Sequence, residues 1–221
     1  MLEVKFTFEK VLEQVEFLVD PECTIPEQSI AIHHITQDMV TGKPKIHEVL
    51  PCILTMAGKY PIVGHGIKFD IDLIAHSASQ HNLPCSIQHN SYIDTLRLAR
   101  LYGESPVNSL EQLRRHFNIE PEGAHRAMSD VLVNMEVFKY LAARYKTTEA
   151  LFEVLSKPIL MKVMPLGKHK GRPMKEVPLE YLQWAAHKDF DMDLLYSIRS
   201  EIKRRKKGNL FTQVANPFKN L

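Results

Sequence analysis

The chain has 221 residues, 44% of them hydrophobic, which suits one large globular domain or one medium domain with a small companion. No apolar run is long enough to span a bilayer, and the charged, alternating N-terminus is unlike a secretory signal, so we expect no membrane partner. The three cysteines form no C-x-x-C pair, and their odd number argues against a disulfide framework, which predicts a cytoplasmic protein.

Charge is unevenly distributed along the chain. From Lys157 onward there are 14 Lys and Arg against 6 Asp and Glu, which leaves 14 against 20 before it. This asymmetry suggests an anionic partner for the C-terminal part. The run KRRKK at 203–207 is equally well explained as a solvated helix end, where cations interact favourably with the helix dipole.

The first part of the chain has an α/β pattern. Residues 3–8 alternate apolar and polar side chains and residues 11–19 do so less strictly, which predicts two paired strands. A loop rich in turn formers is expected after Asp20 and Pro21. Beyond it we predict helices at 46–58, 70–80, 109–117 and 126–144, and short strands at 60–66 and 91–94. This order favours a mixed α/β sheet flanked by helices.

The last part of the chain has a different composition. A helix is predicted at 147–155, and a basic segment with many Gly and Pro residues separates it from two further helices at 179–187 and 193–205. The segment from Leu160 to Arg205, roughly 45 residues, is near the lower size limit for independent folding. We therefore expect Trp184, Tyr181 and Leu194 to supply a compact core.

These patterns divide the chain into four parts. They are an α/β domain at 1–145, a helix and linker at 146–159, a small basic helical domain at 160–207 and a C-terminal tail at 208–221.

Two carboxylates and a histidine stand where an α/β protein binds ligands. Asp70 follows the predicted strand that ends in Gly64-His65-Gly66, and ligands bind outside the carboxyl ends of such strands. His125 precedes the long helix at 126–144, and Asp130 lies in its second turn. Carboxylates bind Mg2+, and an imidazole can deprotonate a metal-bound water. Taken alone, each residue is more readily explained as a surface or helix-end residue.

The order of several motifs strengthens the catalytic interpretation. IPEQSIAIHHITQDMV, GHGIKFD, YIDTLRLAR, NSLEQLRRHFNI and HRAMSD follow one another along residues 1–145. In this order and spacing the segment resembles the DEDDh exonucleases, the superfamily of the proofreading epsilon subunit of bacterial DNA polymerase III. GHGIKFD is similar to the family's H-N-x-x-F-D motif, and HRAMSD matches its H-x-A-x-x-D motif.

The resemblance implies a ribonuclease H-like fold and metal-dependent removal of nucleotides from DNA 3′ ends, in replication or repair. Asp70 and Asp130 would be ligands of two Mg2+ or Mn2+ ions, and His125 would be the general base. His33 and Phe69 would contact the terminal nucleotide. RNA is an alternative substrate, and DNA polymerase III is a candidate partner. The rival hypothesis is a non-catalytic nucleic-acid-binding or polymerase-accessory protein on the same fold.

The chain departs from the family pattern in two places. Family members begin with a strand that carries D-x-E-T, whose acidic residues help hold both metals, whereas the first two strands predicted here correspond to the family's second and third. The D-x-E of Asp20-Pro21-Glu22 falls at a turn. We therefore expect the chain as given to be weak or inactive. Because a core strand is missing with the motif, a late-assigned start or a fragment is favoured over a degraded gene or a fold used only for binding. Gly66 replaces the usual Asn.

The segment MPLGKHKGRPMKEVP, followed by YLQWAA, resembles a small domain of uncharacterised function that follows some bacterial exonucleases. The resemblance does not identify a ligand. Because positive charge concentrates here, we predict nucleic-acid contacts by Lys168, Lys170, Arg172, Arg204 and Arg205. The alternative is a packing module that its lysines merely solubilise.

Overall fold

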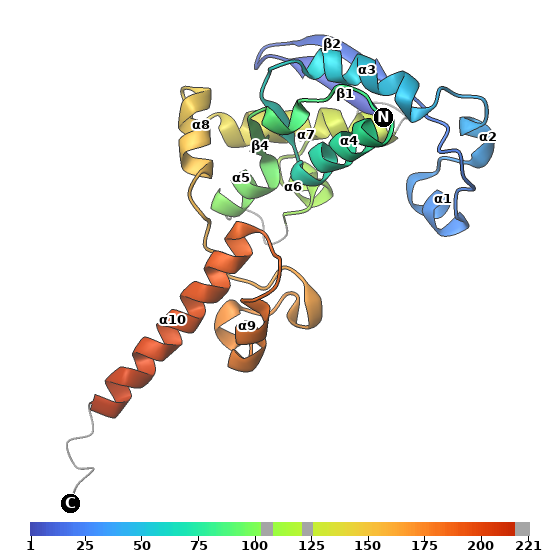
Figure 1. Cartoon of the computed structure of the whole chain (residues 1–221). Coiled ribbons are helices and arrows are strands. Elements are labelled where there is room, and N and C mark those ends of the chain that lie inside the picture. The colour runs from blue at the N-terminus through green and yellow to red at the C-terminus, as the bar shows by residue number, and fades with distance from the viewer. Residues whose placement is uncertain (103–107, 121–125, 215–221) are drawn as a thin grey trace, which may run out of the picture. The chain divides into compact units, whose positions relative to one another are not determined.

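The computed structural model describes residues 1–102, 108–120 and 126–214, and for residues 126–129 and 208–214 it describes the backbone only. The chain divides into two compact units, Met1–Glu153 (unit 1) and Val154–Leu221 (unit 2), shown in Figure 1. The division falls inside the segment predicted as helix and linker.

Unit 1 contains short strands and a larger number of helices. Its elements in chain order are β1 (Leu2–Phe6), β2 (Val11–Glu16), α1 (Glu27–His33), α2 (Gln37–Val40), α3 (Ile46–Ala57), β3 (Ile62–Gly64), α4 (Lys68–Gln80), the 3-10 helix η1 (Ile87–His89), β4 (Tyr92–Asp94), α5 (Thr95–Tyr102), α6 (Leu110–His116), α7 (Arg126–Ala142) and the start of α8 (Thr148–Leu155). The helices and strands predicted from periodicity are all present, with ends that differ by a few residues.

The first two strands form an antiparallel hairpin that packs on α7. The ring centroids of Phe6 and Phe138 are 6.0 Å apart, and those of Phe8 and Phe138 are 5.4 Å apart. Lys5 instead holds its Nζ 4.2 Å from the ring centroid of Tyr60, just after α3. Alternation along β1 therefore directs its aromatic side chain to α7 and its lysine to the other face.

The strands form two pairs instead of one continuous mixed sheet. β1 pairs with β2 in antiparallel register, and β3 pairs with β4 in parallel register. α7 contacts both β1 and β3, so one helix packs against both pairs. Antiparallel and parallel pairing, both expected of a mixed sheet, are thus present, and the mixed α/β class is correct.

The prediction of a loop after Asp20 and Pro21 is only partly correct. The structure places two short helices there, α1 and α2, of which only Val40 is buried. Pro26 precedes α1 with an extended backbone, and Glu27 stands in its first turn, where a carboxylate favours the helix dipole. Helices of one or two turns that bury almost no side chains show no recognisable apolar period. The turn-forming residues of this segment therefore indicate a loop.

Unit 2 is built around two helices and an irregular segment. α9 (Leu179–Ala185) and α10 (Met192–Val214) follow two 3-10 helices, η2 (Gly167–His169) and η3 (Met174–Glu176). α10 extends beyond the predicted end at 205, since no proline interrupts the sequence until Pro217. Over the described residues, no helix is both long and apolar enough to cross a membrane.

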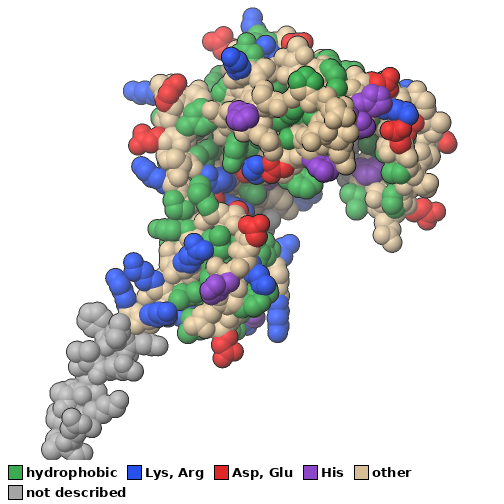
Figure 2. Space-filling model, in the orientation of Figure 1, with side chains coloured by type: hydrophobic (Ala, Val, Ile, Leu, Met, Phe, Trp, Pro, Cys, Tyr) green, Lys and Arg blue, Asp and Glu red, His purple; other side chains and the backbone are tan. Residues whose placement is uncertain are grey.

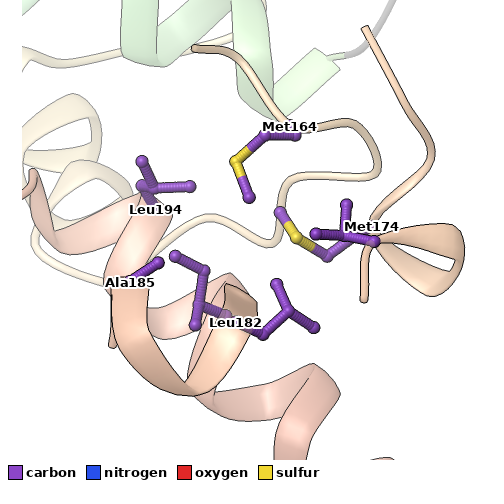
Figure 3. Packing of buried hydrophobic residues seen from close by; sticks show 7 residues of the cluster. Met164, Met174, Leu182, Ala185 and Leu194 are labelled. Carbon is purple, nitrogen blue, oxygen red and sulfur yellow. The ribbon is translucent and has the colours of Figure 1, made fainter. Parts of the chain in front are cut away.

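The core of unit 2 differs from the predicted one. Leu194 is fully buried as expected, but Trp184 is 52% exposed and Tyr181 is only half-buried. The buried cluster, with labelled members that point toward one another in Figure 3, consists of Met164, Met174, Val177, Leu182, Ala185, Leu194 and Ile198. On α9 the inward positions are therefore 182 and 185, three residues apart, and the intervening tryptophan lies outside.

Two buried polar side chains hold the irregular segment onto α10. Asp193 is fully buried, and its Oδ1 accepts the backbone N–H of Ile159 at 2.9 Å. Ser197, also fully buried, accepts the N–H of Met161 through its Oγ at 2.7 Å. A segment without regular structure leaves backbone N–H groups without backbone partners. When such groups are buried they need hydrogen-bond acceptors, and these two side chains supply them.

The buried cluster makes a direct prediction about stability. Leu182→Ala should lower the free energy of unfolding of unit 2 by about 2–5 kcal/mol, because Leu182 is completely buried and its removal leaves a cavity. Urea denaturation followed by circular dichroism measures the effect. Leu160→Ala, at a position that is 60% exposed, is the matched control and should change stability little. Equal losses in the two variants would contradict this core.

Glu3 makes the stability of unit 1 depend on pH. Burial, followed by the nearby charge of Glu13, raises the pKa of Glu3 from 4.5 to about 7, and its Oε2 has no hydrogen-bond partner among the described residues. The folded protein therefore holds this proton more tightly than the unfolded chain does. Below the unfolded pKa near 4.5, Glu3 is protonated in both states, so its burial as a charged group costs the fold nothing. The free energy of unfolding falls as pH rises through about 7, because the buried carboxyl group must then ionise.

Glu3→Gln should accordingly stabilise the protein at pH 8 and have little effect at pH 4.5. Denaturation curves of the variant and the parent at both pH values test this. Glu9→Gln, at an exposed position in the β1–β2 turn, is the control. A stabilisation by Glu3→Gln that is the same at both pH values would rule out this role for the carboxyl group.

Candidate active site

The carboxyl ends of β3 and β4 lie side by side because the two strands are parallel. Asp94, the last residue of β4, accepts the backbone N–H of Gly66 and that of Leu96 with Oδ1, each at 2.9 Å. Its carboxylate therefore fixes the turn that follows β3 and the first turn of α5 at once. Gly66 has φ +73°, a left-handed conformation that Asn also tolerates, so glycine preserves the backbone where the family has Asn.

Thr95 connects these strand ends to α7. The residue is fully buried, and its Oγ1 donates to Oδ1 of Asn134 at 2.7 Å. Nδ1 of His65 lies 3.1 Å from the same Oγ1, and the Gly64 carbonyl oxygen lies 3.3 Å from it. One hydroxyl thus joins the end of β3, the start of α5 and the middle of α7. We name this group the Thr95 network (His65, Thr95 and Asn134, together with Asp94, whose carboxylate holds the adjoining turns).

The histidine of this network is in a partly buried position. Burial lowers the pKa of His65, and the charge of Asp94 opposes that effect. Because burial is the larger effect, His65 is neutral at neutral pH and can take part in the network without a second positive charge beside Arg100.

Asp70 lies in the first turn of α4, shortly after the turn that Asp94 holds. Partial burial raises the pKa of its carboxyl group above the ordinary value, and a hydrogen bond to its own backbone opposes this. The neighbouring Phe69 is 72% exposed, which is unusual for a phenylalanine. The structure thus presents an acidic group beside a large exposed aromatic ring.

The other candidate residues lie on α7 and α1. Asp130 is exposed and stands one helical turn before Asn134, so both are on the same side of α7. His125 lies outside the described residues. His33 is exposed at the end of α1, where its Nδ1 accepts the N–H of Ile35 at 3.0 Å, and Figure 1 shows α1 at one side of unit 1, apart from α4 and β4.

The described residues do not by themselves form a metal site. No group of three or more His, Cys, Asp or Glu side chains among them is placed to hold a metal ion. Asp70 and Asp130 contribute oxygen ligands of the kind that Mg2+ takes, but two carboxylates fall short of a two-metal centre.

The sequence analysis missed three members of the Thr95 network. Asp94 and Thr95 were noted only as part of YIDTLRLAR, and Asn134 was not singled out. An Asp-Thr pair at a strand-to-helix junction is a recognisable signal, since both side chains readily accept backbone hydrogen bonds. The partner on α7 could be found only from the structure, since Thr95 and Asn134 are far apart in sequence.

The basic residues predicted for unit 2 fall into two environments. Lys168, Lys170 and Arg172 are exposed on the turns around η2. Arg204 donates twice to Glu201, at 2.7 and 2.8 Å, while its side chain stays 64% exposed. Arg205 is 21% exposed and donates to Glu201 at 2.7 Å and to the Lys175 carbonyl at 2.9 Å. Its guanidinium is therefore occupied by protein acceptors.

A model of the exonuclease family (RNase_T) matches residues 2–138, which is more than half of the sequence. The chain belongs to the exonuclease family. The predicted family membership is confirmed, and the family is one of phosphodiester hydrolases. A second family, named for a quorum-sensing-regulated virulence factor, matches residues 153–199.

Three relatives illustrate the similarity. DNA polymerase III PolC-type of Clostridium perfringens is 30% identical over 152 residues, covering 68% of this exonuclease and 10% of the polymerase. DNA polymerase III subunit epsilon of Aquifex aeolicus is 33% identical over 58% of the chain and 63% of that subunit. Exodeoxyribonuclease 10 of Escherichia coli is 27% identical over 79% of the chain and 77% of that enzyme. The chain thus spans less than two thirds of the length of the first two.

A solved structure supports the fold. Exonuclease X in complex with 5′ overhanging duplex DNA matches with a TM-score of 0.56 at 23% identity, over 71% of this chain and 89% of that one. The ribonuclease H-like α/β class predicted from the sequence is confirmed.

The Thr95 network predicts a specific loss of stability. Thr95→Val removes the hydroxyl but keeps the shape, which leaves Asn134 Oδ1 without its donor in a buried position. The free energy of unfolding should fall by about 1–3 kcal/mol. Thr95→Ser, which retains the hydroxyl, should lose much less. Chemical denaturation of both variants tests this, and a valine variant as stable as the serine variant would show that the network contributes little.

Proposed function

We propose that this exonuclease removes nucleotides from the 3′ ends of DNA, with Asp70 and Asp130 as metal-binding carboxylates. The observation that carries the proposal is the Thr95 network. Asp94 fixes the turn that leads into α4, which bears Asp70, and Thr95 bonds to α7, which bears Asp130. Both helices are thereby anchored to the same pair of strand ends, where ligands bind in α/β proteins.

Mg2+ or Mn2+ is the proposed cofactor, and His125 the proposed general base. The carboxylates support the choice of metal, because hard divalent cations take carboxylate oxygens as ligands. The histidine suits a general base, because the ordinary pKa of an imidazole lies near neutral pH. The shortage of ligands among the described residues leads us to propose that the 221-residue chain binds metal weakly. His33 and Phe69 are the proposed contacts of the terminal nucleotide, and the exposed ring of Phe69 suits stacking on a base.

DNA is the proposed substrate, with single-stranded 3′ ends as the reactive form, and RNA is the alternative. One of the relatives is named as a DNA polymerase III, one as a subunit of DNA polymerase III and one as an exodeoxyribonuclease, which supports DNA and makes a DNA polymerase III a candidate partner. The second candidate function is nucleic-acid binding without hydrolysis. The absence of a three-ligand group among the described side chains favours it.

Unit 2 is proposed to contribute phosphate contacts. Lys168, Lys170 and Arg172 are the best placed, because they are exposed and bear no carboxylate ion pair among the described residues. Figure 2 shows the Lys and Arg side chains that gather over this unit on one face. Arg204 and Arg205 are expected to contribute less, since Glu201 neutralises part of their charge.

Hydrolysis by the chain as given tests the proposal. We expect slow shortening of a 5′-labelled single-stranded DNA in Mn2+, at a rate far below a complete two-metal enzyme, and no shortening by Asp70→Ala. Asp72→Ala is the matched control, because Asp72 lies on the same helix and pairs with Lys68 at the surface. Gel electrophoresis of timed samples resolves the products.

The possible outcomes separate the two candidate functions. Slow hydrolysis that Asp70→Ala removes and Asp72→Ala keeps supports the exonuclease. DNA binding with no hydrolysis at all favours the non-catalytic function. Rapid hydrolysis abolished by Asp70→Ala would refute the idea that the metal site of this chain is incomplete.

A further inference from the structure

We propose that the side chains around Trp184 form a stacking platform for unpaired nucleic-acid bases on unit 2. The platform consists of Trp184, Tyr181 and His169, with Lys188 over the ring of Trp184 and Lys168 and Lys170 on either side of His169 in the sequence. The inference deepens the proposed function, because it assigns to unit 2 a way of holding single-stranded DNA that charge alone does not provide.

The three rings form one continuous aromatic cluster. The ring centroids of His169 and Tyr181 are 4.6 Å apart with the planes at 79°, and those of Tyr181 and Trp184 are 5.3 Å apart at 42°. Trp184 is the outermost ring, 52% exposed, although Leu182 and Ala185 on the same helix are in the core. Part of the tryptophan ring is therefore accessible to solvent, while the ring also contacts Tyr181.

The backbone around η2 holds this cluster in place. Gly167 has φ +71°, and a Cβ at this position would lie 2.6 Å from the hydroxyl oxygen of Tyr181. Glycine suits this position because of its positive φ, and the absence of a Cβ leaves room for the Tyr181 hydroxyl. The N–H of Gly171 donates to the Met164 carbonyl at 2.9 Å, which ties the same turn to a core residue. The rings are consequently arranged before any ligand arrives, which reduces the ordering that binding requires.

One lysine lies over the ring of Trp184, and two more lie beside His169 in the sequence. Lys188 holds its Nζ 4.8 Å from the ring centroid of Trp184, and Lys168 and Lys170 flank His169 on the exposed turn. Aromatic rings with adjacent lysines are the combination that binds single strands, since bases stack on the rings while cations meet the phosphates. Glu180 and Asp189 are also exposed nearby in the sequence, so the surface is not uniformly cationic and stacking must supply a large share of the affinity.

The single tryptophan of the chain allows a direct test. Titration of the full chain with a thymidine 20-mer in EDTA should quench the tryptophan fluorescence, because the bases stack on Trp184. By fluorescence anisotropy of a labelled 20-mer, Trp184→Ala should bind about 5-fold to 150-fold more weakly, the range expected for loss of one stacked base. Trp184→Phe should retain most of the affinity. Circular dichroism melting checks that each variant is folded.

Tyr196→Ala is the matched control. Tyr196 is 45% exposed on α10, where it lines a surface groove with Pro158 and Arg199 and does not belong to the aromatic cluster. Its replacement should leave the affinity within about 2-fold of the parent, since an exposed aromatic residue outside the platform has no base to stack on. An equal loss in Tyr196→Ala and Trp184→Ala would overturn the assignment of the platform.

Two further results would also overturn it. One is binding of the 20-mer without quenching and without any effect of Trp184→Ala, which would leave a purely electrostatic surface. The other is a failure of the chain to bind the 20-mer at low salt. In that case the rings do not bind nucleic acid, and a protein segment becomes the remaining candidate ligand. Because EDTA prevents metal-dependent hydrolysis, quenching can succeed where the Asp70→Ala hydrolysis experiment fails, and the two proposals are tested separately.

Discussion

The hydrogen bond between Thr95 and Asn134 is the contact on which the candidate site depends. It joins the carboxyl ends of β3 and β4 to α7 inside unit 1, where a missing partner would leave a buried polar atom without compensation. α7 also packs against β1, β3, α5 and α6, so this bond at 2.7 Å adds a directional constraint to the apolar packing. Asp130 lies one helical turn before Asn134 on the same side of α7, near this anchored position.

The sequence predicted most of the fold because periodicity is a strong signal in long helices. α3, α4 and α7 each have enough turns for an apolar face to be recognised, and all three are present. α1 and α2 were missed because they bury almost nothing. Trp184 was placed in the core because large aromatic residues usually lie there, and the three-residue spacing of Leu182 and Ala185 decided otherwise. The Thr95 network could not be predicted, since it depends on tertiary contacts between distant segments.

The candidate site itself was predicted only as a set of residue types. Asp70 and Asp130 came from the order of motifs, and nothing in the sequence established how their helices are held. The structure supplies that information through Asp94, whose carboxylate is committed to two backbone donors. Because both bonds are made to Oδ1, this one oxygen holds the turn after β3 and the start of α5 in place.

Unit 2 shows why a count of charges overestimates a binding surface. Arg204 and Arg205 contribute two positive charges to the sequence, yet Glu201 is 10% exposed and bonded to both, and the pKa of its carboxyl group is lowered to about 2 by these arginines. Glu201 is therefore ionised at neutral pH, and it offsets part of the charge of the last helix. Lys188, in contrast, lies over the ring of Trp184, with its Nζ 4.8 Å from the ring centroid. A half-exposed aromatic ring can stack on a base, which a cation alone cannot do, so the proposed binding of single strands depends on the rings of unit 2 as well as on its charge.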